Sequence, residues 1–266
     1  MDDALAELRF LASSANRVRV LEALSDGATT RREVEARTGV ARSTVARALD
    51  EAAERDWVDS EGSRYWTTPE GEARLSAFRT YLETTAGMQH LGPALRWLPD
   101  PVRALDYRHL RDAELTYPTD DNPAAPFDRG LAVLEAADEY RSLTQNSFPR
   151  YMAVVRDRVV AGVLDFEGIV ADAFVETLRG EPDRARVWHD LADRVWVYDG
   201  HVPVNLQVAD GTAVIWLCGP DHDGDDVVVK GLLESDDPAV VSWAESYYRE
   251  FRAEADPIET TGLPVA

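Results

Sequence analysis

The chain has 266 residues, 45% of them hydrophobic, which is enough for one large domain or two smaller ones. It carries 28 Lys and Arg against 49 Asp and Glu, giving a formal net charge of −21. This composition excludes a disordered chain, and no apolar run is long enough for a transmembrane helix. The amino terminus lacks a signal-peptide pattern, and the single Cys218 excludes a disulfide framework or a multi-cysteine zinc site. We therefore expect a cytoplasmic protein with no membrane partner.

The acidity is unevenly distributed. Residues 1–90 hold 12 basic and 16 acidic side chains, residues 91–266 hold 16 and 33, and the stretch 28–47 has a net charge of +3. All basic residues except Lys230 are arginine, and such an acidic, lysine-poor chain resembles proteins of salt-loving archaea. In molar salt the Debye length falls to about 3 Å, so the acidity does not exclude a nucleic-acid partner.

The first predicted elements are three helices. Apolar residues spaced three or four apart from Leu5 to Leu21 predict one helix that ends at Gly27. Thr30 and Glu33 form a capping-box pattern that begins a short second helix, and Gly39 ends it. After a tight turn, a third helix turns its apolar residues inward. Its predicted outward side chains are Arg42, Ser43, Thr44 and Arg47.

Two further elements complete the amino-terminal third. The strand-like segments around Trp57 and Tyr65, joined by a turn at 61–62, predict a small hairpin. Thr68 and Pro69 then begin a helix that extends to about residue 89. This helix carries an apolar stripe, Leu75, Phe78, Tyr81 and Leu82, that fits either a dimer interface or packing on its own hairpin.

This order of elements is that of a winged helix, and the stretch "TRREVEARTGVARSTVARALDEAAERDWV" resembles the winged helix-turn-helix of bacterial and archaeal transcription regulators. The resemblance covers residues 5–90 and implies a double-stranded DNA partner, with the third helix in the major groove. Because two half-sites give specificity, it also implies a homodimer. Arginine donates two hydrogen bonds to guanine, and Ser and Thr contact bases or phosphates. The expected DNA-binding residues are Arg31, Arg32, Arg42, Ser43, Thr44, Arg47, Arg64 and Tyr65.

Two other interpretations of these arginines stay open. They can be ordinary solvated surface, which is the default for a charged helix face. The winged helix can also dock another protein, fused to a metabolite-binding or residual hydrolase domain. The local loss of acid around the third helix favours DNA binding over both.

The remaining two thirds alternate helical and strand-like segments. Three prolines near 91–101 predict a linker, "AELTYP" predicts a strand, and "RGLAVLEAADEYRSL" predicts a helix. Further helical segments precede four strands between 194 and 235, and a last helix begins at Asp237 and Pro238. We therefore expect an α+β or α/β fold: a winged helix-turn-helix at 1–90, a linker at 91–103, a mixed α/β effector domain at 104–256 and a tail at 257–266.

The second domain carries its own resemblance. The stretches "RDAELTYPTDDNPAAPFDRGL", "VYDGHVPVNLQVAD" and "LLESDDPAVVSWAESYYREFRAEA" resemble the effector domain of archaeal winged-helix regulators of the filament-growth (FilR) type. Those domains are distantly similar to one half of a phospholipase D fold. The resemblance implies a sensor of a small molecule, with a sugar or sugar phosphate suggested by analogy, and not a catalyst.

The residues predict no enzyme, no metal site and no cofactor. Phospholipase D chemistry needs a His-x-Lys pair, whereas His201 is followed by Val202 and Pro203. The histidines show no metal-ligand spacing with one another or with Cys218, which we interpret as a buried small residue. The segment "DHDGDD" at 221–226 lacks the closing Glu of a calcium loop and is interpreted as a solvated turn.

Ligands on mixed sheets bind beyond strand ends. The predicted strand ends carry Asp165, Asp199 and His201, with Asn205 on the next strand. These four are the candidate ligand-binding residues. The alternative is that they only form turns in an acid-rich chain.

Overall fold

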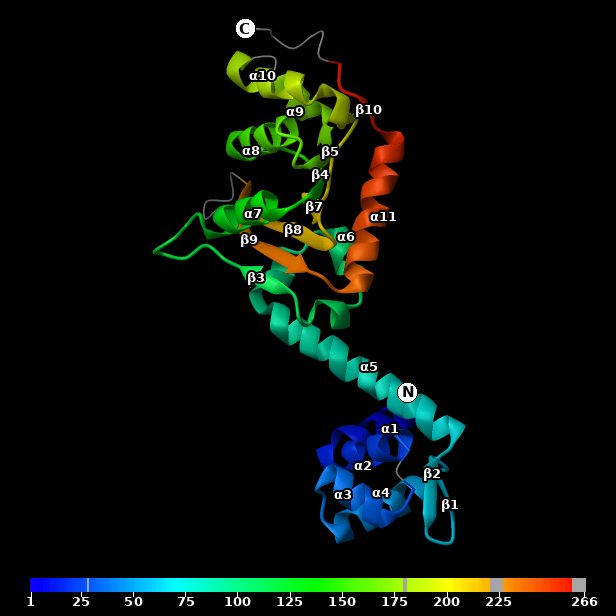
Figure 1. Cartoon of the computed structure of the whole chain (residues 1–266). Helices are drawn as coiled ribbons and strands as arrows, with labels where there is room; N and C mark the ends of the chain where they lie inside the picture. Colours follow the sequence, from blue (N-terminus) through cyan, green and yellow to red (C-terminus); the bar gives the residue numbers. More distant parts are fainter. Residues whose placement is uncertain (28, 179–180, 221–226, 260–266) are drawn as a thin grey trace. The chain divides into compact units, whose positions relative to one another are not determined.

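The computed structural model describes residues 1–27, 29–178, 181–220 and 227–259, with the side chains of 182–184 left aside (Figure 1). The chain divides into two compact units, Met1–Glu83 and Thr84–Ala266. The division falls inside a single helix, α5, Pro69–Leu91. No helix in the described ranges is both long and apolar enough to cross a membrane.

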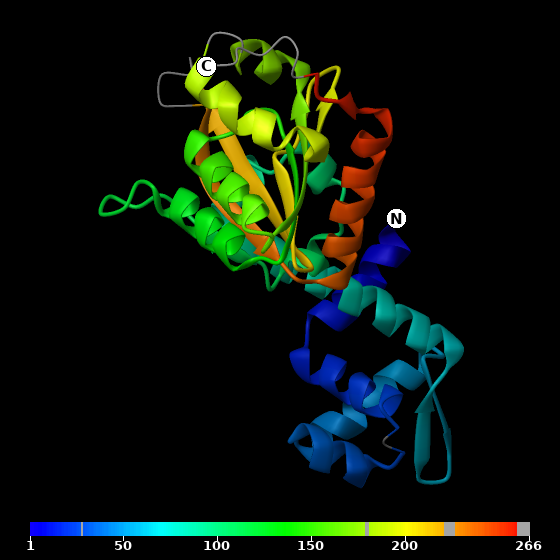
Figure 2. The ribbon, with the colours of Figure 1, turned by 45° about the horizontal axis from the view of Figure 1, so that its top comes forward.

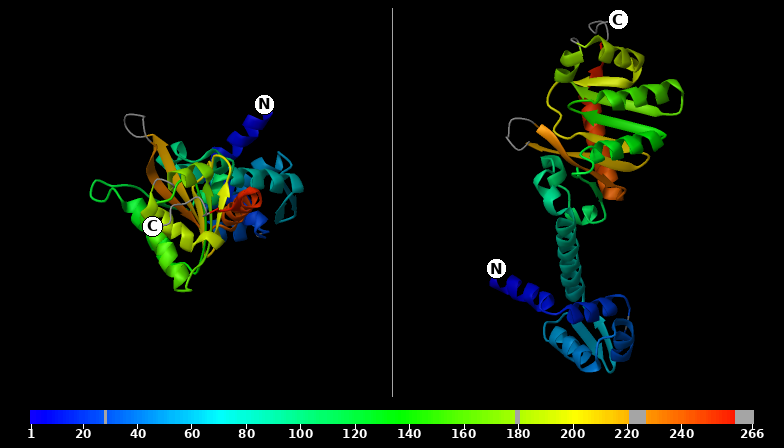
Figure 3. Two further views of the ribbon diagram at one scale, coloured as in Figure 1. Left: turned by 90° about the horizontal axis from the view of Figure 1, so that it is seen from above. Right: turned by 90° about the vertical axis from the view of Figure 1, so that its left-hand side faces the viewer.

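The amino-terminal unit is a winged helix. Its elements are α1 (Asp2–Ala12), α2 (Ala15–Ser25), α3 (Arg31–Thr38), α4 (Arg42–Ala53), β1 (Val58–Glu61), β2 (Arg64–Thr67) and the start of α5. The single helix predicted from Leu5 to Leu21 is wrong, because the Ser14 hydroxyl accepts a hydrogen bond from the Arg17 amide and begins a new helix. Leu5 and Leu8 are consequently exposed, and the right-hand panel of Figure 3 shows α1 extending away from α2–α4.

The turn between α3 and α4 follows directly from the sequence. Thr30 and Glu33 form the predicted capping box at the start of α3. Gly39 adopts φ 66° at the end of α3, a left-handed conformation that favours glycine. The chain can therefore reverse and begin α4 only three residues later. Val34, Val45 and Leu49 are fully buried between these helices and hold their crossing in place.

The carboxy-terminal unit is a mixed α/β domain built on one sheet. The sheet order is β10-β6-β5-β4-β7-β8-β9-β3, and only β4, β5 and β6 are mutually parallel. The strands are β3 (Glu114–Thr116), β4 (Glu139–Thr144), β5 (Asp165–Ala171), β6 (Val195–Tyr198), β7 (Leu206–Ala209), β8 (Thr212–Pro220), β9 (Val227–Ser235) and β10 (Asp256–Pro257). The helices are η1 (Gly92–Arg96), α6 (Asp100–Arg103), η2 (Tyr107–Leu110), α7 (Ala125–Ala136), α8 (Pro149–Val160), α9 (Asp172–Leu178), α10 (Pro182–Asp190), η3 (Ala192–Arg194) and α11 (Pro238–Glu254).

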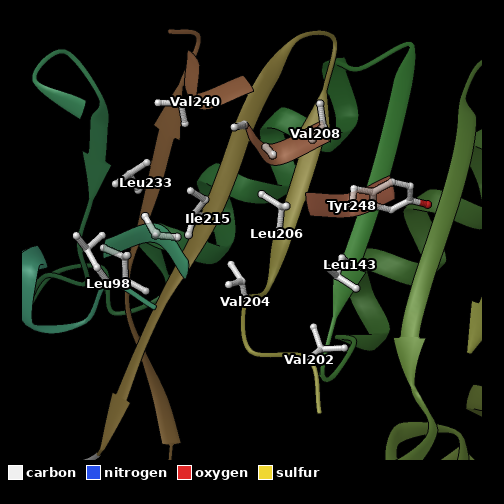
Figure 4. Packing of buried hydrophobic residues seen from close by; sticks show 14 of the residues in the cluster. Leu98, Leu143, Val202, Val204, Leu206, Val208, Ile215, Leu233, Val240 and Tyr248 are labelled. Carbon is white, nitrogen blue, oxygen red and sulfur yellow. The ribbon is translucent and has the colours of Figure 1, made fainter. Parts of the chain in front are cut away.

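Helices cover both faces of this sheet. Helix α11 lies on one face and α7–α10 lie on the other (Figures 2 and 3). Under α11, the sheet residues Leu143, Leu206 and Ile215 pack with Val240 and Tyr248 (Figure 4). Helix α11 begins as predicted, since the Asp237 carboxylate accepts a hydrogen bond from the Ala239 amide at 2.8 Å.

Three predicted segments need correction. The expected linker at 91–103 instead holds the end of α5, η1 and α6, and its buried residues Leu91, Leu98 and Val102 belong to the core under α11. The helix predicted over 129–143 ends at Ala136, and the rest becomes β4, because its apolar residues alternate toward the two faces of the sheet. The expected tail also begins later, since β10 pairs with β6 and Ile258 is buried.

The pairing of β8 with β9 shifts by one residue. Leu217 lies opposite Gly231, while the next residue, Cys218, lies opposite Val229. Lys230 is the extra residue of this β-bulge.

Candidate functional site

The first turns of α4 present a polar, exposed face. Val45, Ala48 and Leu49 point into the core, and this helical spacing turns Arg42, Ser43 and Arg47 to the solvent. Thr44 lies beside them and is half-buried. The residue before the helix, Ala41, offers no side-chain cap, so the first amide groups of α4 stay open to an acceptor.

Two of the expected DNA-contacting arginines are held by carboxylates in the free protein. Arg47 donates to Glu51 at 2.8 Å, and Arg17 donates to the same carboxyl group at 2.5 Å. These hydrogen bonds lower the pKa of Glu51, that of Arg47 being the larger cause. Arg31 likewise donates to Asp50 at 3.0 Å. The Arg47 side chain is 79% exposed, so a phosphate or base can replace its carboxylate at low cost.

The wing is attached to the start of α3. The Tyr65 amide donates to the Thr29 carbonyl at 2.7 Å, and Thr30 and Arg64 form a β-bridge. The Arg31 guanidinium lies over the Tyr65 ring at 5.1 Å from its centroid. Tyr65 therefore orients Arg31.

The structure brings several of the predicted residues together. Ser43, Thr44 and Arg47 share one shallow depression with Ser14 and Arg17, which the sequence had not indicated. Ser14 and Arg17 reach this depression because α2 packs against α4, a contact that the sequence alone does not show. Arg32, Arg42 and Arg64 are exposed and form no salt bridge with other described residues.

The second unit has a partly open cavity of about 230 Å³ between the sheet and α8. Its wall includes five aromatic side chains, Tyr140, Phe148, Tyr151, Phe166 and Trp216. The Tyr151 hydroxyl donates to the Phe127 carbonyl at 2.5 Å, and the Trp216 indole donates to Gln207 at 2.7 Å. These bonds fix two of the rings.

Glycine at position 130 allows α7 to lie against this wall. A β-carbon there would meet the Tyr151 hydroxyl at 2.6 Å and the Trp216 ring at 3.0 Å. No larger residue fits without displacing the aromatic side chains.

The polar part of the cavity is neutral. Asn205 accepts hydrogen bonds from the Thr144 hydroxyl at 2.9 Å and the Gln145 amide at 2.8 Å. Cys218 and Ser142 also line the cavity, and burial raises the pKa of the Cys218 thiol.

Of the four predicted ligand residues, only Asn205 lines this cavity. Asp165 begins β5 instead of ending a strand. It lies at the amino-terminal ends of the parallel strands β4 and β5, where it pairs with Arg194 at 3.5 Å. Asp199 and His201 are exposed in the segment before β7. The prediction put Asp165 at the end of a strand, whereas β5 begins there and continues to Ala171.

Among the described residues, no lysine lies beside His201. The Lys position of a phospholipase D pair holds Pro203, and Lys230 lies on β9, two strands away from β7. Within the described part of the chain, no three His, Cys, Asp or Glu residues lie close enough to hold a metal ion. The acidic segment 221–226 lies outside the described residues.

Each of the two units, the winged helix and the mixed α/β domain, is matched by comparison with known proteins. Residues 5–89 match the HVO_A0261 N-terminal domain, and residues 123–254 match the middle domain of the methanogenesis regulatory protein FilR1. The two matches follow each other along the chain, one in each of its two units.

Solved structures are similar at low identity. The archaeal chromatin protein TrmBL2 is 12% identical, with a TM-score of 0.39 over 92% of this chain and 94% of its own. The phospholipase D family member Nuc from Salmonella typhimurium is 10% identical, with a TM-score of 0.41 over 56% of this chain and 98% of its own. NucT from Helicobacter pylori is 11% identical, with a TM-score of 0.41 over 55% and 99%. No curated protein sequence matches the chain.

Proposed function

We propose that the protein is a transcription regulator that binds double-stranded DNA through its winged helix and a small-molecule effector through its second unit. One observation carries the proposal: the first turns of α4 expose Arg42, Ser43 and Arg47 on a face without an unpaired carboxylate. This arrangement suits a recognition helix in the major groove.

The wing and the start of α3 extend this surface. Arg32 and Arg64 are exposed and free of salt bridges with described residues, and we propose that they contact phosphates on either side of the groove. Arg31 and Tyr65, which lie against each other, complete the proposed contact set together with Thr44 and Arg47.

We propose a homodimer, because one winged helix reads few base pairs. Helix α5 offers Tyr81 and Leu82, which are 56% and 45% exposed. Leu75 and Phe78, the other members of the predicted stripe, are buried in the core of the amino-terminal unit. Of the stripe, only Tyr81 and Leu82 are therefore exposed enough to contribute to a dimer interface.

The test is a mobility-shift experiment with the full chain and the DNA upstream of its own gene, in molar potassium chloride. Saturable binding that competitor DNA of unrelated sequence does not displace is expected. If the folded protein does not shift DNA but retains another protein, the winged helix is a protein-docking module.

A second candidate, a residual hydrolase, is favoured by no arrangement of described residues around His201. The effector also remains to be assigned. A sugar phosphate, suggested by analogy, requires a cationic partner, and the cavity described above has none among its described residues.

A further inference from the structure

The cavity of the second unit lacks charge in a highly charged protein. Asp, Glu, Lys and Arg make up 29% of the chain, yet none of the described residues that line the cavity is one of these or a histidine. An ionic ligand would therefore find no counter-charge among the described lining residues, which is unfavourable wherever that ligand is desolvated. In a chain of net charge −21, a site for a cation would be expected to include a carboxylate. The described lining thus favours a neutral ligand over an ion of either sign.

Its walls are suited to a flat, apolar ring. Trp216 lies 5.9 Å from Tyr151 and 6.0 Å from Phe148, measured between ring centroids. Tyr140 and Phe166 form a second, stacked pair at 6.3 Å and 23°. Aromatic side chains favour offset or edge-to-face contacts with another ring.

A few polar groups are left to orient such a ring. Gln207 is buried, and its carboxamide oxygen accepts from the Trp216 indole, while its amide nitrogen carries two further N–H donors. Tyr140 and Ser142 add two hydroxyl groups to the lining. Each can bind one polar atom of a ligand.

The volume limits the size of the ligand. An engineered apolar cavity of roughly 150 Å³ binds benzene. The cavity here, at about 230 Å³, is half as large again and matches two fused rings better than one.

We propose that the effector is a neutral, planar, bicyclic aromatic compound carrying one or two polar groups, bound in the cavity lined by Tyr140, Ser142, Gln207 and Trp216. It enters the low-dielectric site without losing an ionic hydration shell, and its ring contacts Trp216. That this ligand acts as an effector rests on the proposed function. That the cavity binds it does not.

The test measures binding to the full chain without DNA, by isothermal titration calorimetry in molar potassium chloride. The neutral probes are indole and 2-naphthol, and the charged probes are choline and glucose 6-phosphate. Ser142→Leu and Val229→Phe each fill the cavity, and Ser242→Leu on the exposed side of α11 is the matched control.

We expect at least one neutral probe to bind, and each folded cavity-filling variant to weaken it about tenfold or more. Ser242→Leu should leave its affinity unchanged. The proposal is overturned if neither neutral probe binds, if binding survives both filling variants, or if a charged probe binds more tightly in a way that those variants abolish.

The two proposals fail separately. A protein that shifts DNA and binds neither neutral probe refutes the ligand class alone. A protein that binds indole in the cavity and never binds DNA refutes the regulatory role alone.

Discussion

Replacing Arg47 by alanine tests the DNA-binding surface most directly. On DNA, Arg47 gains a base contact worth about 1–3 kcal/mol and gives up its exposed pair with Glu51, worth about 0.3–0.5 kcal/mol. The base contact is the larger effect. The variant should therefore lose a net 0.5–2.7 kcal/mol, or roughly 2–100-fold in Kd, by difference.

The assay is a mobility-shift titration on the bound DNA, with folding followed by circular dichroism. Arg74→Ala is the matched control, because Arg74 forms the same kind of exposed helical pair, with Glu70 at 3.2 Å, on α5. It should bind as the unaltered protein does. Normal affinity of a folded Arg47→Ala protein would refute the placement of α4 in the groove.

Three further outcomes are expected. DNA binding should persist in molar potassium chloride and be no stronger in dilute buffer, since salt screens the repulsion between DNA and the acidic surface. A steep loss of DNA affinity with rising salt, measured while the protein stays folded, would contradict this. The pKa of Glu33 is lowered from 4.5 to about 2, chiefly by the Thr29 amide and then by Thr30, so the stability it contributes is present above about pH 4.5 and is lost as pH falls toward 2. Thermal unfolding across that window should show this loss, and Glu33→Gln, which keeps a capping side chain but does not titrate, should flatten it. The full chain should not hydrolyse bis(p-nitrophenyl) phosphate, because the lysine of the His-x-Lys pair is missing; turnover that His201→Ala abolishes would show otherwise.

Local signals made the amino-terminal unit predictable. The Thr30–Glu33 capping box, Gly39 and the spacing of Val45 and Leu49 each depend on residues a few positions apart. The break at Ser14 was missed because an apolar stripe continues across it in the sequence. The docking of Arg17 on Glu51 was invisible, since it joins residues 34 positions apart.

The cavity of the second unit was harder to predict from the sequence. Of its residues only Asn205 was singled out, because polar residues at strand ends were taken as the signal. The residues that actually line the cavity alternate along the strands. In the sequence, their aromatic side chains cannot be distinguished from those of an ordinary hydrophobic core. Tyr140 in particular lay in a segment predicted to be helical. Which side of β4 faces the cavity depends on the order of strands, which local patterns do not determine.

The one-residue bulge in β9 decides which side chains reach the cavity. Val227, Val228 and Val229 border it, with Val229 opposite Cys218, and beyond the bulge Leu232 lies on the same face of the sheet as Val229. With regular pairing, Lys230, which is two residues before Leu232, would lie on that face instead. Deleting Val229 would thus place the chain's only lysine opposite Cys218, on the face that carries the aromatic rings. The insertion keeps an ammonium group out of a neutral chamber.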